Sequence, residues 1–451
     1  MYSLLIIIPL CALTHINSIE LTLNYQNELL TLPIKVGTPP QDFDLLFDTT
    51  TFHLWLPNST LSKTFPNTFS IIESSSFEKD QDNKDVLQIV GQKGTDVLDF
   101  VDFYDESIKA DKKFHLILID TTQGQEVVLH LFDGTIGFAR KYLGKMKQVK
   151  QSNYVEANPK FSIVQYLYNS NIIDSKAFYL RFISNNQAKL TLGYYPGDSK
   201  ETINYCTVND TEVTESLIPL WLCKSDYISF SEEKQKVFPN ETIVILDSSI
   251  DYIQLASKTA TEIFNVLDNA LGLNCIRNVV TGLGISYFCP GGINTNKVPN
   301  FYIHIAEGFD LKITGKDLFK EYMIDDKGKN LYGYRANIIS NGKTNIMYLG
   351  MNFIKHYHIV FDKEEYKIGF GDYIGEEIFD YSKKPSTNIP NETSIFKWFC
   401  IVIVLLFIAV IGFWLYRRSQ LKKRYRKGIV HKSHSDSDNL IEPIGKPMVS
   451  V

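Results

Sequence analysis

Apolar residues in this chain fall in many short runs and rarely follow a long helical period. Runs such as Leu45-Leu46-Phe47 and Val244-Ile245-Leu246 are bounded within a few residues by Asn, Asp, Gly or Ser. This pattern is typical of β-strands that are joined by turns, and it predicts an all-β fold. Because 451 residues are too many for one hydrophobic core, we expect two β-lobes.

Two longer apolar segments, one near each end, differ from the strand pattern. Residues 4–13 are an apolar core followed by small and polar residues, which predicts a signal peptide at residues 1–18. Residues 398–416 carry no charge and precede a basic cluster. They predict a transmembrane helix at 395–416 and a cytoplasmic tail at 417–451, as in a single-pass type I protein of the secretory pathway. The two β-lobes are then expected at residues 19–197 and 198–394.

Charge restricts the expected partners. The net charge is −5, although residues 417–451 hold nine Lys or Arg against three Asp or Glu, so the part before the tail is acidic. We therefore expect no nucleic-acid partner. In the tail, Asp436, Leu440 and Ile441 resemble an acidic dileucine signal, which predicts a sorting adaptor as partner and delivery to endosomes or lysosomes. The cell surface is the alternative location.

Cysteines agree with a secreted ectodomain. Four of them lie outside the two apolar segments, and an even number in an oxidising compartment predicts two disulfides. Three connectivities are open, and the simplest pairs Cys206 with Cys223 and Cys275 with Cys289. Sequons that mark candidate glycosylation sites stand at Asn58, Asn209, Asn240 and Asn391.

No motif suggests a metal or another cofactor. The chain has no CxxC pair and no His/Cys cluster. His356 and His358 alternate beside Tyr357, and no third ligand is found for them, so a solvated strand face is the preferred interpretation.

Two aspartates stand at the ends of apolar runs, one in each half of the chain. Asp48 follows residues 45–47 and precedes Thr49, and Asp247 follows residues 244–246 and precedes Ser248. Two carboxylates held about 3 Å apart cannot both ionise, so one proton is shared and one carboxylate is left to activate water. The pattern predicts a paired-aspartate catalytic site.

Each aspartate has a later echo on an apolar run that contains a glycine. The echoes are Thr135-Ile136-Gly137 and Met347-Tyr348-Leu349-Gly350. A glycine in such a strand lets a second backbone pass closely behind the aspartate loop. Two echoes in the same order and at similar separations argue for two similar β-lobes.

With these motifs the chain resembles the pepsin-like aspartic proteases along nearly the whole expected ectodomain. The matching stretches are residues 36–41, 47–49, 54–57, 190–193, 349–350, 360–362 and 367–370. The resemblance implies a bilobal pepsin-like fold, with two similar β-lobes around a peptide-binding cleft and a sheet beneath the cleft that joins the lobes. A peptide or protein would be the substrate or ligand.

The resemblance also implies residue roles. Asp48 and Asp247 would share the catalytic water, Thr49 and Ser248 would bond to the backbone of the opposite loop, and Trp55 would pack behind the flap. In the mechanism one carboxylate acts as general base toward water, and the protonated one stabilises the developing oxyanion.

The residues after each aspartate pair depart from the family, which has glycine there. Thr50 and Ser249 take these positions, and the β-branched Thr50 is expected to fill space where close approach is needed. At the next position Thr51 can give a hydroxyl to the carboxylate, whereas Ile250 cannot. Asp251 adds a third carboxylate, which would raise the pKa values of the pair if it faces the cleft.

The flap region departs as well. The family has a tyrosine before a glycine-rich turn, and here Val90 or Ile89 stands before Gly91. Neither side chain can donate a hydrogen bond, so closure over the transition state is expected to be weaker.

Two functions of different class remain open. The first is a membrane-anchored aspartic endopeptidase that cleaves extended peptides at acidic pH with weak activity, and it rests on the two aspartates and their hydroxyl neighbours. The second is a catalytically inactive relative that uses the cleft to bind a peptide or protein. It rests on the altered flanking residues and on the absence of Lys or Arg between Ser18 and Leu32, where the family carries a basic prosegment.

Overall fold

The fold was obtained as a computed structural model. It describes residues 17–63, 65–79, 91–96, 98–101, 107–109, 114–119, 132–140, 162–193, 202–208, 210–214, 217–230, 235–236, 242–271, 275–280, 284–326, 329–340, 345–374 and 416. Residues 1–380 belong to one compact unit and residues 381–451 to a second. The expected signal peptide before residue 17, the transmembrane segment before residue 416 and the tail lie outside the described residues. Among those described, no helix has both the length and the apolar character needed to cross a membrane.

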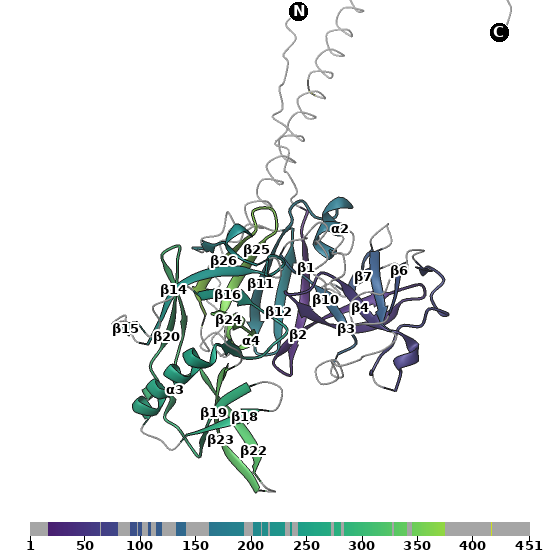
Figure 1. Cartoon of the computed structure of the whole chain (residues 1–451). Helices are drawn as coiled ribbons and strands as arrows, with labels where there is room; N and C mark the ends of the chain where they lie inside the picture. Colours follow the sequence, from purple (N-terminus) through teal and green to yellow (C-terminus); the bar gives the residue numbers. More distant parts are fainter. Residues whose placement is uncertain are drawn as a thin grey trace, which may run out of the picture. The chain divides into compact units, whose positions relative to one another are not determined.

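The compact unit is built mainly from two β-sheets (Figure 1). Fifteen described strands form the first sheet. Its strands are β1 (Ile19–Gln26), β2 (Leu29–Val36), β3 (Gln41–Asp48), β4 (Leu54–Pro57), β5 (Glu78–Lys79), β6 (Gly91–Asp96), β7 (Leu98–Val101), β8 (Ser107–Lys109), β9 (Phe114–Ile119), β10 (Thr135–Gly137), β11 (Ala177–Ser184), β12 (Gln187–Leu192), β13 (Asn204–Cys206), β25 (Tyr357–Asp362) and β26 (Lys367–Tyr373).

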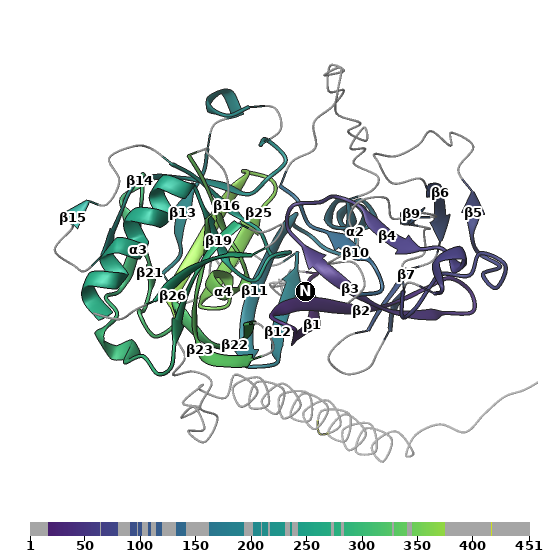
Figure 2. The same cartoon turned by 60° about the horizontal axis from the view of Figure 1, so that its bottom comes forward.

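The second sheet has eleven described strands. They are β14 (Leu222–Phe230), β15 (Gln235–Lys236), β16 (Thr242–Leu246), β17 (Ile253–Leu255), β18 (Ile276–Val280), β19 (Gly284–Pro290), β20 (Phe301–Ile305), β21 (Phe309–Ile313), β22 (Phe319–Asp326), β23 (Lys329–Ser340) and β24 (Ile346–Leu349). Figure 2 shows β2, β3, β4 and β6 of the first sheet on one side of the unit and the second sheet on the other. The first-sheet strands β13, β25 and β26 lie on the side of the second sheet, with β11, β12 and β1 between the two sides. The described part of the chain is therefore mostly β and forms two sheets, which is consistent with the expected two-lobed architecture.

Helices are few among the described residues. They are α2 (Ile163–Asn169), α3 (Ser257–Leu271) and α4 (Met351–Ile354), with short 3-10 turns at Ser59–Leu61, Asp210–Glu212 and Thr295–Lys297. In α3 the apolar residues Ala260, Ile263, Phe264 and Leu267 are buried, and this i, i+3, i+4, i+7 spacing gives the helix one apolar face. That face packs on the second sheet, where α3 contacts β23.

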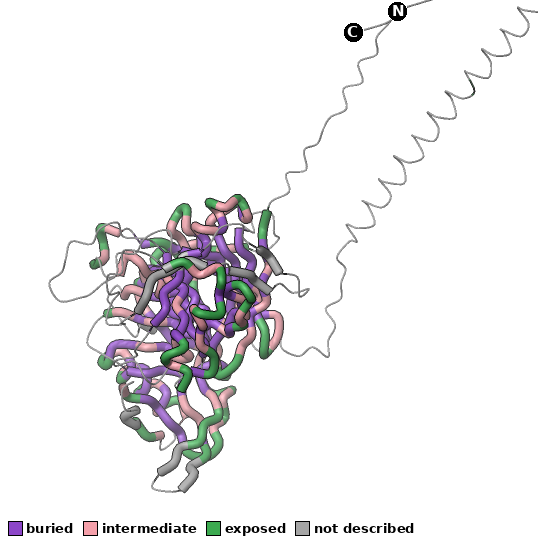
Figure 3. The backbone as a smooth tube through the Cα atoms, turned by 90° about the vertical axis from the view of Figure 1, so that its right-hand side faces the viewer, coloured by how far each residue is buried: buried purple, intermediate pink, exposed green. Residues whose placement is uncertain are grey.

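Burial along the strands explains the two kinds of apolar run seen in the sequence. In β1 the residues Ile19, Leu21 and Leu23 are buried and alternate with less buried neighbours, as expected for a strand with one covered face. The final residues of β3 and of β16 are all buried, so these strands are covered on both faces. Figure 3 shows the buried backbone concentrated inside the unit.

Strands from residues 357–373 complete the first sheet. β25 pairs with β11, with Ala177 opposite Asp362, and β26 pairs in turn with β25 and β13. The first sheet therefore holds strands from both expected lobes. This agrees with the joining sheet that the family resemblance implied.

Both disulfides follow the simplest pairing. Cys206 bonds to Cys223, and Cys275 bonds to Cys289, which confirms the prediction of two disulfides and selects one of the three open connectivities.

Two residues that were expected at the surface are buried. His356 is buried and its ring stacks on Tyr373, so the interpretation of a solvated strand face was wrong for this residue. Asn58 is also buried and accepts a hydrogen bond from the Ser59 hydroxyl, and its glycosylation stays a prediction. The other three sequon asparagines lie outside the described residues.

Candidate active site

Each aspartate is carried by the same arrangement of three strands. Asp48 ends β3, which runs parallel to β10 with Gly137 opposite Asp48, and β10 pairs in turn with β4. Asp247 follows β16, which runs parallel to β24 with Leu246 opposite Leu349, and β24 pairs with β17. The echo motifs are thus the strands that lie beside the two aspartate strands, as the sequence predicted.

The echo glycines are required by close backbone contact. A Cβ atom on Gly137 would lie 2.4 Å from the carbonyl oxygen of Thr51. A Cβ atom on Gly350 would lie 2.4 Å from the carbonyl oxygen of Tyr252 and 2.6 Å from that of Ile250. Any larger residue would push the loop that follows each aspartate away from its strand.

The hydroxyls of Thr49 and Ser248 lock the two loops together. Thr49 Oγ1 donates to the carbonyl of Leu246 at 3.0 Å and accepts from the backbone N–H of Ser248 at 3.1 Å. Ser248 Oγ donates to the carbonyl of Phe47 at 2.7 Å and accepts from the backbone N–H of Thr49 at 3.0 Å. Since every partner is buried, these four reciprocal bonds fix one aspartate relative to the other.

Both carboxylates are buried and hydrogen-bonded. Asp48 is 5% exposed and Asp247 is 9% exposed. Oδ1 of Asp48 accepts from the backbone N–H and from the hydroxyl of Thr50, each at 2.7 Å. Oδ1 of Asp247 accepts from the N–H of Ser249 at 3.0 Å and from its hydroxyl at 2.6 Å. The residues that replace glycine thus act alike in both loops.

Thr50 makes a contact that the sequence did not predict. Its hydroxyl turns toward Asp48 and donates to the carboxylate, and the expected obstruction of the approach stays a prediction. The hydroxyl supplies charge stabilisation that a glycine could not provide.

The carboxyl groups of Asp48 and Asp247 are electrostatically coupled. Burial raises the pKa of Asp247 first, the neighbouring charge of Asp48 raises it further, and the pKa reaches about 6. Burial also raises the pKa of Asp48, while the hydrogen bonds from Thr50 and the adjacent Thr51 oppose this rise. The two carboxylates therefore titrate as a pair that keeps one shared proton in the acidic range.

The next residues differ between the loops. The Thr51 hydroxyl is buried beside Asp48 and helps to lower the pKa of that carboxyl, although it makes no hydrogen bond of full geometry among the described residues. Ile250 offers no hydroxyl to Asp247. Asp251 faces Lys320 at 3.0 Å, and the rise in the pKa of Asp247 comes from burial and Asp48.

The flap is described in part. Trp55 of β4 lies opposite Ile117 of β9 and packs beside Phe65 and Ile119. Gly91 begins β6 and pairs with Ile119 of the same β9 strand, so Trp55 adjoins the strand next to the expected flap. Val90 lies outside the described residues, and the flap roles stay predictions.

Two loops of one design, each delivering a buried carboxylate and locked to the other through hydroxyls, define the class of aspartic proteases. The family model described as eukaryotic aspartyl protease matches residues 31–373, so the chain belongs to this family. The match begins in β2, ends at the last residue of β26, and includes both aspartate loops. It confirms the resemblance read from the motifs. No curated protein matches the chain.

One group of charged residues near the site was not found as a group from the sequence. Glu28 in the β1–β2 turn and Lys320 in β22 come together with Asp251. These three residues are far apart along the chain, so no local sequence pattern indicated that they form a group.

The Thr50 hydroxyl gives a testable effect on pH dependence. In Thr50→Val the side-chain volume and the backbone N–H bond stay, but the hydroxyl that stabilises ionised Asp48 is lost. We expect the pKa of Asp48 to rise, so that the acidic limb of the profile of kcat/KM against pH moves upward by about one pH unit. Thr50→Ser restores the hydroxyl and should restore the limb. An unshifted limb in Thr50→Val would show that the hydroxyl does not support Asp48.

Proposed function

We propose that this protein is a membrane-anchored aspartic endopeptidase that cleaves extended peptides at acidic pH. The observation that supports this best is the pair of buried, coupled carboxylates, each held by a backbone donor and a side-chain hydroxyl. Such a pair can hold a water molecule between one ionised and one protonated carboxyl group. No metal is needed for this chemistry, because the ionised carboxylate activates the water.

In the proposed reaction the ionised carboxylate takes a proton from water as the water attacks the peptide carbonyl. The protonated carboxyl group donates a hydrogen bond to the oxyanion that forms, and a proton then passes to the leaving amine. The reciprocal bonds of Thr49 and Ser248 hold both carboxylates in place during these transfers. Because both aspartates are needed in opposite protonation states, activity should rise as the pH falls below about 6, the pKa of Asp247.

We expect turnover to be weak. Ile250 offers Asp247 no hydroxyl at the position where Thr51 stands beside Asp48. The valine expected in the flap also lacks a donor, and one lost donor to the transition state can reduce its stabilisation by about 2–4 kcal/mol.

The proposed setting is an acidifying compartment. The uncharged segment at residues 398–416 and the basic cluster after it support a single-pass anchor with the ectodomain in the lumen. Asp436, Leu440 and Ile441 in the proposed cytoplasmic tail support sorting to endosomes or lysosomes, where the pH would suit the aspartate pair. The cell surface is the alternative.

A catalytically inactive, peptide-binding relative is the second candidate. It is favoured by the asymmetry of the site: Ile250 cannot donate, and the buried Thr51 hydroxyl makes no full hydrogen bond among the described residues. In that case the cleft would bind a peptide or protein without cleaving it.

The test is peptide cleavage by the purified full chain between pH 3 and 7, with products identified by mass spectrometry. An Asp48→Asn preparation runs beside it, because contaminating proteases would act equally in both. Cleavage that increases with acidity and disappears in Asp48→Asn is the expected result. If folded wild-type protein cleaves no more than the variant, the endopeptidase proposal fails and the binding function gains support.

A further inference from the structure

A second group of charged residues joins the two sheets close to the aspartate pair. Lys320 of β22 donates through its ammonium group to Glu28, which lies in the turn between β1 and β2. The same ammonium group donates to Oδ2 of Asp251 at 3.0 Å, and Asp251 lies in the loop that follows Asp247. The charges of Asp251 and Asp247 both raise the pKa of Tyr252, after the larger effect of burial. The charged group therefore adjoins the catalytic loop.

The carboxylates form the outer part of this group. The side chains of Glu28 and Asp251 are 38% and 26% exposed, whereas Lys320 is 19% exposed. Arg335, whose guanidinium lies 3.9 Å from Asp251, is 11% exposed. A ligand that approaches from solvent therefore meets negative charge first. The group as a whole is neutral, because its two carboxylates are balanced by the two cations of Lys320 and Arg335.

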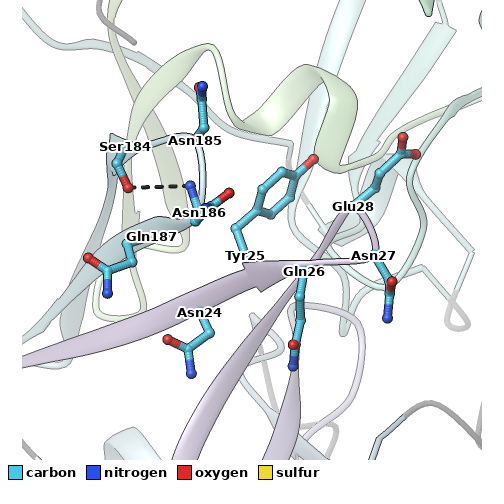
Figure 4. A pocket seen from close by; sticks show the side chains of 9 residues that line it. All are labelled: Asn24, Tyr25, Gln26, Asn27, Glu28, Ser184, Asn185, Asn186 and Gln187. Carbon is cyan, nitrogen blue, oxygen red and sulfur yellow. Dashed lines mark hydrogen bonds between the residues drawn. The ribbon is translucent and has the colours of Figure 1, made fainter. Parts of the chain in front are cut away.

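Glu28 also borders a hollow of about 800 Å³ between two β-turns (Figure 4). It is the one charged residue among those that line the hollow. Six of the nine lining residues are asparagine or glutamine, whose amides can donate to and accept from the polar groups of a peptide. An anionic side chain would find no lining cation, and an aliphatic one would find little apolar wall.

Tyr25 supplies a polar group beside Glu28. Figure 4 shows that Tyr25 and Glu28 point to one side of the β1–β2 turn, whereas Asn24, Gln26 and Asn27 point to the other. The Tyr25 hydroxyl is buried and has no hydrogen-bond partner among the described residues. Burial, then the charges of Glu28 and Asp251, raise the pKa of Tyr25, so its hydroxyl stays neutral beside the two carboxylates.

We propose that Glu28, Asp251 and Tyr25 form a subsite for a lysine or arginine side chain of the bound peptide, with Lys320 as the resident counter-ion that tunes it. This inference rests on the proposed function, since it names a preference of the same peptide cleft. The basic side chain passes along the Tyr25 ring, places its charged end against the two carboxylates and shares them with Lys320. Glu28, Asp251 and Lys320 are thus specificity-determining residues, and none of them takes part in bond cleavage.

The groups that face Glu28 give the subsite a pH dependence. Burial and then the hydrogen bond with Asp251 raise the pKa of Glu28, while Lys320 opposes this rise. Burial alone would raise the pKa of Asp251, but the bond with Glu28 and the charges of Lys320 and Arg335 bring it below its ordinary value. As the pH falls, Glu28 takes up a proton before Asp251 does. The preference for a basic side chain should then weaken, because one of the two carboxylates has lost its charge.

The test compares peptides that carry lysine or norleucine at one position in turn within a constant sequence. Binding is measured at pH 5.5 by fluorescence anisotropy with the full-length Asp48→Asn protein, so that cleavage does not interfere, and cleavage of the same peptides is measured with wild type. We expect one position at which lysine binds about tenfold more tightly than norleucine, the effect of a hydrogen-bonded charge. Adding Glu28→Gln should remove the preference, whereas adding Lys320→Met should increase it, because the two carboxylates lose the cation that they share.

Glu212→Gln is the matched control, since Glu212 pairs with Lys224 at 3.3 Å away from the aspartate loops and should leave the preference unchanged. The opposite signs expected for Glu28→Gln and Lys320→Met separate a subsite from general damage to the fold. If no position prefers lysine, or if the preference survives Glu28→Gln, the subsite is refuted. Lysine-selective binding without cleavage by wild type would support the subsite and refute the endopeptidase, whereas unselective cleavage would do the reverse.

Discussion

Asparagine in place of Asp247 is expected to reduce peptide cleavage about 1,000-fold and, in the same protein, to increase stability at neutral pH. The loss of activity follows because asparagine can neither accept nor release the proton that the pair must transfer, and general acid–base catalysis contributes about 10²–10⁴-fold. The gain in stability follows because the folded protein buries Asp247 beside the charge of Asp48.

The sign of the stability effect comes from the direction of the pKa shift. The pKa of Asp247 rises from 3.8 to about 6 on folding, so the folded state binds the proton more tightly than the unfolded state. This contribution is fully present below about pH 4 and is lost as the pH rises through about 6. At pH 7 the ionised carboxylate therefore destabilises the fold, on the order of 2–3 kcal/mol, and a neutral amide avoids that penalty.

Chemical denaturation of wild type and Asp247→Asn at pH 4 and pH 7 measures this effect, beside the cleavage assay. The wild type should lose stability between the two pH values more steeply than the variant. Asp226→Asn, at an exposed position of β14, is the control and should change neither stability nor cleavage. If the stability of wild type and of Asp247→Asn depended equally on pH, Asp247 would not be a buried carboxyl group with a raised pKa.

Thr49→Val is expected to destabilise the protein by about 2–5 kcal/mol and to impair cleavage strongly. Valine keeps the volume of threonine but removes the hydroxyl, which leaves the carbonyl of Leu246 and the N–H of Ser248 without this partner in the interior. Each such buried group costs about 1–3 kcal/mol. The two aspartate loops then lose one half of their reciprocal connection, so the carboxylates no longer keep a fixed separation.

Thr22→Val provides the matched control for this change. The hydroxyl of Thr22 is also buried, but it has no hydrogen-bond partner among the described residues. The same substitution should therefore be neutral or slightly stabilising there. Thermal unfolding and kcat are measured for both variants. Similar effects in the two would mean that the hydrogen bonds of Thr49 stabilise neither the fold nor the arrangement of the aspartates.

The sequence predicted those features whose signals are local. An apolar run followed by aspartate and a hydroxyl residue marks each aspartate loop, because a strand covered on both faces must be apolar up to the residue that leaves it. Gly137 and Gly350 were visible because close backbone contact permits no Cβ atom. Two disulfides could be inferred from the even number of cysteines, and the structure then showed that each joins cysteines that are near in sequence.

Features that depend on side-chain orientation or on distant partners were not predictable in this way. The rotamer of Thr50 places its hydroxyl on Asp48, and no pattern of residue types specifies a rotamer. Asp251 was expected to raise the pKa values of the aspartate pair if it faced the cleft, and no sequence pattern indicated that Lys320 from a distant strand binds it. His356 lies in a sequence pattern typical of a strand with one solvent-exposed face, but the ring of Tyr373 stacks on its imidazole.

The pairing of β25 with β11 constrains how the protein is made. The ribosome releases β11 long before it has synthesised residues 357–362, so during translation one edge of β11 stays without its final neighbour. An unpaired strand edge can pair with other chains, which makes such intermediates dependent on chaperones. The first half of the chain is therefore not an independent folding module. A protein truncated before β25 would have an unpaired strand edge in its first sheet and would not form a smaller functional lobe.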